Sequence, residues 1–192
     1  VYERNNNLSF LSCGIALWVG NHVSDPDKMF YSSPEALTEL GAKMNMEHDV
    51  LSIDPDNKTL EVKDLKTGEV TTNTYDKLVV TTGSAPIIPP IEGIDNKRVK
   101  LCKNWAHAAE LKRIDDDIKS VIVIGAGYIG AELAEQYALT GREVTLIDGL
   151  PSVLAKNFDP EISDRVAKDY TDHGVKLAMN EMVQGFSGDD QI

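Results

Sequence analysis

The sequence predicts an α/β protein built on a parallel sheet with helices on both faces, together with a small antiparallel meander. Strand-like and helix-like segments alternate beyond residue 98, which is typical of a parallel α/β sheet. A G-x-G-x-x-G pattern at residues 125–130 stands between an apolar β-branched run and a helical segment. Between residues 42 and 80, short alternating runs are separated by turn residues, as in antiparallel strands.

The first half of the chain is expected to contain short elements. Residues 1–3, "VYE", resemble the end of a strand, and residues 15–23 are compatible with a helix. Two serines before Pro34 predict a helix start, so residues 34–41 form a short helix that Gly41 ends. The meander then leads into "KLVVTTG" at 77–83, which is predicted to be a buried strand.

The second half begins after a linker rich in proline and glycine, "SAPIIPPIEGID". The strands that follow are expected at 99–102, 120–124, 143–148 and 175–179. The helices between them are expected at 105–114, from the glycine motif to 139, and over 160–174.

Composition excludes several classes of partner. The 192 residues carry a net charge of −12, which disfavours nucleic acid and anionic membranes. The acidic runs at 115–117 and 189–190 are interpreted as solvated surface. Apolar runs are too short for a membrane helix, and no secretory signal opens the chain. Two cysteines make no disulfide framework, so the reducing cytoplasm is the expected compartment. The four histidines predict no metal site.

The glycine motif predicts a Rossmann-like NAD-binding domain. Gly125 would permit the tight turn, Gly127 the approach of a pyrophosphate, and Gly130 close packing of helix on strand. The second strand ends at Asp148, 18 residues after Gly130, where its carboxylate would accept hydrogen bonds from the adenosine ribose. This carboxylate would repel a 2′-phosphate and no arginine follows closely, so NAD(H) is favoured over NADP(H). The alternative is a packed α/β unit without nucleotide.

Three more residues of this helix are candidate ligands. The N–H of Ile129 faces the phosphates at the positive end of the helix dipole. Tyr128 would cover a ring or pack in the core. Glu132 would contact the nicotinamide or simply favour the helix dipole.

Five segments together resemble the flavin- and pyridine-nucleotide-dependent disulfide reductase superfamily, in its single-cysteine branch. They are "YE" at 2–3, "SFLSCGIALW" at 9–18, "TTGSAP" at 81–86, "GAGYIGAELAE" at 125–135 and "VTLIDG" at 144–149. The resemblance implies an internal piece of a longer enzyme, with an incomplete FAD-binding domain at 1–90 and an NAD-binding domain at 91–192. The glycine motif for FAD and the C-terminal dimerisation domain of such enzymes are missing from it.

The resemblance also implies an activity, that of a flavoprotein NADH oxidase. Hydride would pass from NADH to FAD, and dioxygen would be reduced to water through Cys13, cycling between thiol and sulfenic acid. NADH peroxidase and coenzyme A-disulfide reductase remain alternatives within the branch. For the intact protein, the resemblance implies a homodimer or higher oligomer. Its substrates would be small molecules, namely NADH together with dioxygen or peroxide. A third alternative is a non-catalytic NAD-binding fragment.

Further residue roles follow from the same resemblance. Glu3 would bind the FAD ribose, Val50 would meet the adenine through its backbone, and Lys103 would lie near the flavin. The loop past the FAD would comprise Thr81, Thr82, Gly83 and Ser84. Each also has a purely structural reading, as a surface acid, a strand residue, a solvated lysine and a turn.

Cys13 is the candidate catalytic residue. The two-cysteine members of the superfamily use C-x4-C, but Leu8 and Trp18 stand five residues either side of Cys13, which excludes a local dithiol. A lone thiol can still cycle through sulfenic acid or a mixed disulfide. Placement at a helix start would favour the thiolate, whereas a buried structural thiol is the alternative. Cys102 is interpreted as a thiol in the core of a strand.

Overall fold

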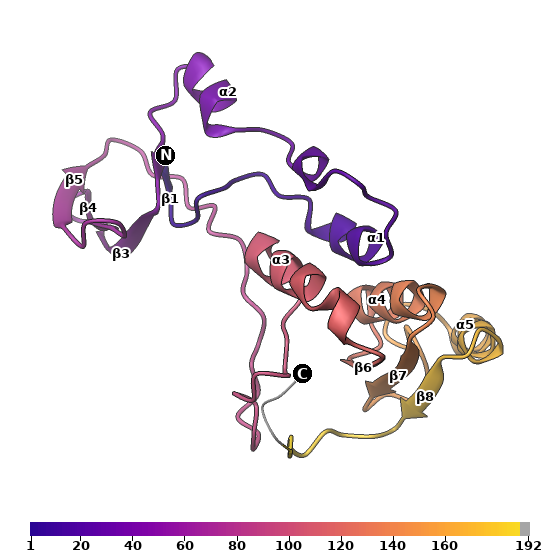
Figure 1. The fold of residues 1–192 in the computed structure, drawn as a ribbon. Coiled ribbons are helices and arrows are strands. Elements are labelled where there is room, and N and C mark those ends of the chain that lie inside the picture. Colours follow the sequence, from indigo (N-terminus) through magenta and orange to yellow (C-terminus); the bar gives the residue numbers. More distant parts are fainter. Residues whose placement is uncertain (189–192) are drawn as a thin grey trace. The chain divides into compact units, whose positions relative to one another are not determined.

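The computed structural model describes residues 1–188, in two compact units (Figure 1). The first unit comprises residues 1–11 and 27–84, and the second comprises residues 12–26 and the chain from 85 onward. The segment with Cys13 therefore belongs by its contacts to the second unit. The acidic pair at 189–190 lies outside the described residues. Within the described part, no helix has the length and apolar character needed to cross a membrane.

The first unit contains two small sheets and one helix. Strand β1 pairs in parallel with β2, and β3, β4 and β5 form an antiparallel meander in that order. Leu60 and Val62 of the central strand are buried, which confirms the predicted meander. The bounds are β1 Tyr2–Glu3, β2 Asn45–Met46, β3 His48–Asp54, β4 Thr59–Asp64, β5 Val70–Thr74 and α2 Pro34–Glu39.

Helix α2 begins and ends as its sequence predicts. The Ser33 hydroxyl accepts a hydrogen bond from the Ala36 N–H at 3.1 Å, and Pro34 occupies the first turn, where a missing N–H costs nothing. Gly41 follows with φ +94°, a left-handed conformation that glycine adopts without strain.

The second unit is a three-stranded parallel sheet with helices packed on it. Its strands run in the order β6-β7-β8, each paired in parallel with the next. Helix α4 packs on β6 and β7, while α5 packs on β8 and α1 packs on α3 and α4. The bounds are α1 Ile15–Val19, α3 Trp105–Arg113, β6 Ser120–Ile124, α4 Tyr128–Leu139, β7 Glu143–Asp148, α5 Pro160–Asp172 and β8 Lys176–Met179.

The two faces of β6 differ in their surroundings. Val123 and its neighbour Leu146 in β7 are buried beneath the helix layer. Ile122 and Ile124 point to the opposite face and are 65% and 51% exposed. Helices were predicted on both faces, but this face of β6 is not covered by the described residues. An apolar run on both faces is the pattern of a strand that is buried on both sides.

Two predicted strands are absent from the described structure. Residues 77–83 form no ladder, and Val79 and Val80 are 80% and 60% exposed. Residues 99–102 are also irregular. An apolar β-branched run becomes a strand only when a neighbouring edge supplies hydrogen-bond partners, and neither segment has such an edge here.

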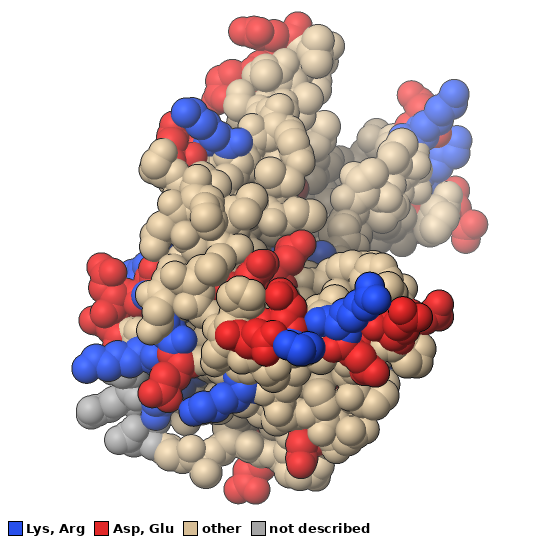
Figure 2. Space-filling view, turned by 90° about the vertical axis from the view of Figure 1, so that its right-hand side faces the viewer, with Lys and Arg blue, Asp and Glu red and all other residues tan. Residues whose placement is uncertain are grey.

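Surface charge is mixed. On the face drawn in Figure 2, acidic side chains are interspersed with basic ones, although acids outnumber Lys and Arg by 31 to 19 in the chain. The acidic run 115–117 is predicted to be solvated, but one of its members, Asp115, is only 4% exposed. Its burial is explained by two cations, the nearby Lys112 and the more distant Arg142, that pair with its carboxylate.

Candidate nucleotide-binding site and redox cysteine

The glycine motif connects the end of β6 to the start of α4. Gly125 has φ +101°, and its N–H donates to the Ile147 carbonyl of β7 at 2.8 Å. A Cβ on Gly130 would lie 1.7 Å from the Gly125 carbonyl oxygen, so a larger residue there requires the helix and the loop to shift where they cross. A Cβ on Gly127 would meet nothing within 4 Å. The backbone at Gly127 is therefore open to a ligand, as the sequence predicts for the second glycine.

The first turn of α4 presents backbone donors to this opening. Its N-cap is Gly127, so no side chain caps the first N–H groups of the helix. Tyr128 and Ile129 are 54% and 56% exposed in that turn. An uncapped N-terminus of a twelve-residue helix combines free donors with the positive end of the helix dipole, which suits a phosphate.

Asp148 anchors the loop and keeps acceptor capacity. Its Oδ2 accepts the Ala126 N–H at 2.6 Å, and its Oδ1 accepts the Leu150 N–H at 2.8 Å. An ionised carboxylate has about four lone-pair positions. Two of them hold the glycine loop against the loop after β7, and two remain for hydroxyl groups of a ligand.

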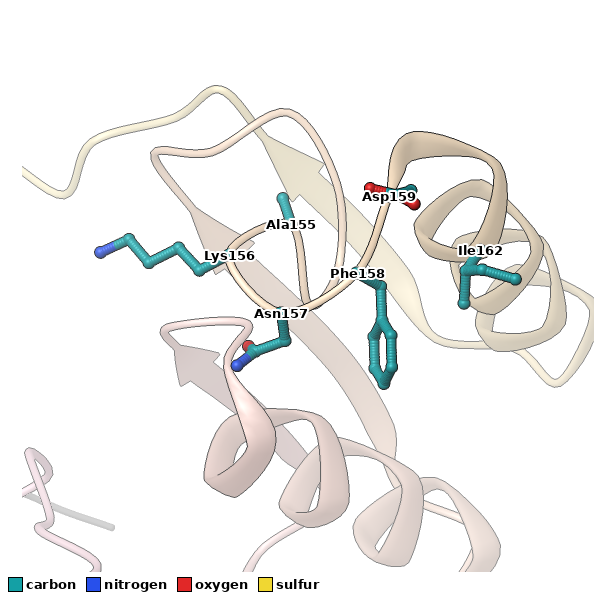
Figure 3. Close-up of a pocket in the computed structure, with 6 residues that line it drawn as sticks. All are labelled: Ala155, Lys156, Asn157, Phe158, Asp159 and Ile162. Carbon is teal, nitrogen blue, oxygen red and sulfur yellow. The ribbon is translucent and has the colours of Figure 1, made fainter.

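The loop after β7 was not singled out from the sequence. The Leu154 N–H donates to the Ala126 carbonyl at 2.8 Å, and the Phe158 ring meets the Tyr128 ring edge-on with centroids 6.4 Å apart. Five residues of the loop and Ile162 of α5 line a shallow pocket (Figure 3). They are Ala155, Lys156, Asn157, Phe158, Asp159 and Ile162. The only sequence feature that indicates a role for this loop is its position directly after Asp148.

Cys13 lies on an exposed turn of the second unit. It belongs to a single 3-10 turn, Ser12–Gly14, that leads into α1, which is shorter than predicted. The alternative of a buried Cys13 is therefore wrong. Trp18 of α1 stacks on Trp105 of α3, with centroids 5.1 Å apart and planes 4° apart. Because Trp105 follows Lys103 by two residues, this contact brings together the segments that carry Cys13 and Lys103.

Cys102 differs from Cys13 in its surroundings. It is half-buried, and burial raises the pKa of its thiol to about 11. It lies in an irregular segment rather than in the strand expected there. Because thiolates are the reactive form, Cys102 is chemically quiet near neutral pH.

The remaining candidates differ in their exposure and hydrogen bonding. Glu132 is exposed in the second turn of α4. Glu3, in the first unit, accepts hydrogen bonds from the Asn5 backbone and side chain at 2.8 and 2.6 Å. Val50 is 36% exposed beside a bulge in β3. Residues 81–84 form an exposed loop in which Gly83 has φ +68°. The FAD contacts expected of Glu3, Val50 and residues 81–84, and the nicotinamide contact expected of Glu132, stay predictions.

Known proteins resemble this chain along its whole length. The NADH oxidase of Enterococcus faecalis is 51% identical over 191 residues, which cover 100% of this chain and 43% of that protein. The NADH oxidase of Streptococcus pyogenes is 43% identical, over 100% of this chain and 44% of that protein. The chain thus spans less than half the length of these relatives.

Solved structures of an NADH oxidase and an NADPH oxidase also match this chain. The water-forming NADH oxidase from Lactobacillus brevis, bound to NADH, matches with a TM-score of 0.96 and 58% identity. The match covers 97% of this chain and 42% of that one. An engineered water-forming NADPH oxidase derived from it, bound to NADPH, matches with the same TM-score and 57% identity.

The family model agrees with the glycine loop and with these relatives. The model described as pyridine nucleotide-disulphide oxidoreductase matches residues 1–192. The chain belongs to the pyridine nucleotide-disulphide oxidoreductase family.

Proposed function

We propose that the intact protein is a cytoplasmic, homo-oligomeric flavoprotein NADH oxidase that reduces dioxygen to water, with Cys13 as its redox thiol. The observation that carries the proposal is the exposed Cys13, held on the same unit as an open glycine loop. The similarity to NADH oxidases, one of them water-forming, supports it.

The residues at the glycine loop fit NADH. The open backbone at Gly127 and the first turn of α4 would hold the pyrophosphate, and the two free lone-pair positions of Asp148 would bind the ribose hydroxyls. The same carboxylate would repel a 2′-phosphate. The engineered NADPH oxidase is altered at a glycine and an aspartate 18 residues apart, the separation of Gly130 and Asp148. This supports Asp148 as the residue that selects NADH.

FAD would bind through the residues that the family resemblance implies. Glu3 would hold the ribose, Val50 the adenine through its backbone, and residues 81–84 and Lys103 would line the rest. The spare oxygen of Glu3 and the exposed 81–84 loop are compatible with this assignment. When bound, FAD carries two electrons at a time between NADH and the acceptor.

Cys13 would complete the reduction of oxygen. Two electrons from one NADH convert dioxygen to hydrogen peroxide. The Cys13 thiolate then attacks one peroxide oxygen, the O–O bond breaks, and the sulfur becomes a sulfenic acid while hydroxide leaves and is protonated to water. Two electrons from a second NADH restore the thiol and release a second water. The balance is one dioxygen and two protons consumed per two NADH, giving two waters.

The test measures oxygen consumed per NADH oxidised in the full-length protein. Wild type is expected to consume one dioxygen per two NADH, and Cys13→Ser one per NADH with peroxide released. Cys102→Ser is the matched control and should behave as wild type, because its thiol is half-buried. Unchanged stoichiometry in Cys13→Ser would exclude the redox role. Faster turnover with peroxide or coenzyme A disulfide than with dioxygen would favour the two rival activities, and no turnover would favour a binding protein.

A further inference from the structure

A buried ion cluster lies between α3 and the start of β7. Asp115 is 4% exposed, and its carboxylate sits between two cations. Its Oδ2 accepts a hydrogen bond from the Lys112 Nζ at 3.0 Å, and its Oδ1 lies 2.8 Å from a guanidinium nitrogen of Arg142. A carboxylate this deeply buried requires such compensation, because an unpaired one would cost several kcal/mol. The cluster therefore holds the end of α3 and the start of β7 together within the second unit.

Lys112 extends this cluster to α1. Its ammonium also donates to the Asn21 side-chain oxygen at 2.5 Å, across 91 positions of sequence. Asn21 follows Gly20, the C-cap of α1, and has φ +63°. The Asn21 N–H donates to the Trp18 carbonyl at 3.1 Å, so the asparagine is part of the helix ending. Lys112 thereby connects the end of α1, the helix that follows the Cys13 turn, to a buried carboxylate.

Arg142 connects the same carboxylate to the sheet. Its guanidinium donates to the Asp115 and Ile118 carbonyls and to the Thr140 hydroxyl, and lies 5.7 Å from the centre of the Tyr137 ring. Arg142 directly precedes β7. The cluster therefore sits at the amino end of this strand, whereas Asp148 and the glycine loop lie at the carboxyl ends of β6 and β7.

Helix α1 needs external support. It has five residues, fewer than an isolated helix requires to be stable in water. Val19 is fully buried and Trp18 stacks on Trp105, but these apolar contacts constrain rotation and sliding less than a hydrogen bond does. The charge-assisted bond from Lys112 to Asn21 supplies a direction-specific contact at the C-terminal end of α1.

We propose that Lys112 is a positioning residue for Cys13: it clamps Asn21 and so holds the Cys13 turn in register on the second unit. The proposal rests on the proposed redox role of Cys13. A reactive group must be held within about 0.5 Å of its productive geometry, so loss of the clamp would lower the efficiency with which Cys13 captures peroxide.

The experiment compares Lys112→Met and Lys112→Arg in the full-length holoenzyme. Asn21→Gly removes the acceptor that follows α1 while leaving Asp115 paired, and glycine tolerates φ +63°. Lys100→Met is the matched control, because the Lys100 Nζ is a partly buried partner of Glu110 at 2.8 Å, a pair that leaves α1 untouched. Three quantities are measured: peroxide released per NADH, KM for NADH, and the alkylation rate of Cys13 by iodoacetamide.

The expected result is about a tenfold rise in released peroxide and in Cys13 alkylation for Lys112→Met and Asn21→Gly, the order allowed by one lost charge-assisted hydrogen bond. KM for NADH should stay unchanged, since the glycine loop lies at the opposite end of the strands. Lys112→Arg should restore most of the wild-type behaviour, and Lys100→Met should match wild type.

Wild-type peroxide and alkylation values in both Lys112→Met and Asn21→Gly would overturn the proposal. If wild type itself releases all its peroxide, the proposed function fails instead. In that case the alkylation rate of Cys13 alone tests the role of Lys112. An unchanged rate in both variants overturns the proposal, and a tenfold rise upholds it.

Discussion

Replacing Gly130 by alanine would place a methyl group 1.7 Å from the Gly125 carbonyl oxygen and 3.4 Å from a methyl of Val123. The first contact is with backbone, so α4 and the glycine loop must separate by about 1.7 Å to reach ordinary contact. Overpacking of this kind costs about 1–3 kcal/mol of stability. Because the donors in the first turn of α4 move with the helix, NADH affinity should fall by about tenfold or more.

The assay is a thermal melt together with an equilibrium titration of NADH on the full-length protein. Gly127→Ala is the matched control, since its methyl would meet nothing within 4 Å. It should leave stability nearly unchanged and weaken only NADH binding, by occupying the space in which the pyrophosphate approaches. Wild-type melting and affinity for Gly130→Ala, or a strong loss of stability for Gly127→Ala, would refute this division of roles.

Two more predictions concern a carboxylate and the two thiols. Asp148→Asn should weaken NADH binding and reduce the preference for NADH over NADPH by about tenfold, because the amide nitrogen cannot accept the N–H of Ala126 or Leu150 or a ribose hydroxyl. Equal selectivity of mutant and wild type in a competition of NADH with NADPH would count against it. Iodoacetamide at pH 8 should label Cys13 well before Cys102, whose labelling should rise only as the pH approaches its raised pKa of about 11. Peptide mass spectrometry across pH 7–11 checks this order, and early labelling of Cys102 at pH 8 would contradict it.

Local chemistry made the glycine motif and its surroundings predictable. The left-handed turn at Gly125, the close approach of helix and loop at Gly130 and the cap at Ser33 each depend on backbone a few residues away. The βαβ order followed from the change of apolar period between strands and helices. These features needed no knowledge of distant partners.

Predictions that required a distant partner were less successful. The apolar residues Val79 and Val80 suggested a buried strand, but a strand forms only beside another edge, and here both side chains are exposed. Asp115 stood in an acidic run typical of solvated surface, yet Arg142, 27 positions away, makes its burial tolerable. No sequence pattern indicates a role for Phe158, because its ring contacts Tyr128 only in the folded structure.

The sequence by itself determined the parallel βαβ unit, the nucleotide fingerprint and the absence of a dithiol around Cys13, because turns, caps and residue spacing act between near neighbours in the chain. Only the tertiary structure decided that Cys13 is exposed, that Asp115 is buried and that Lys112 holds Asn21 from 91 positions away. Such contacts depend on which helices pack together, and a buried carboxylate such as Asp115 requires charged partners that only this packing supplies.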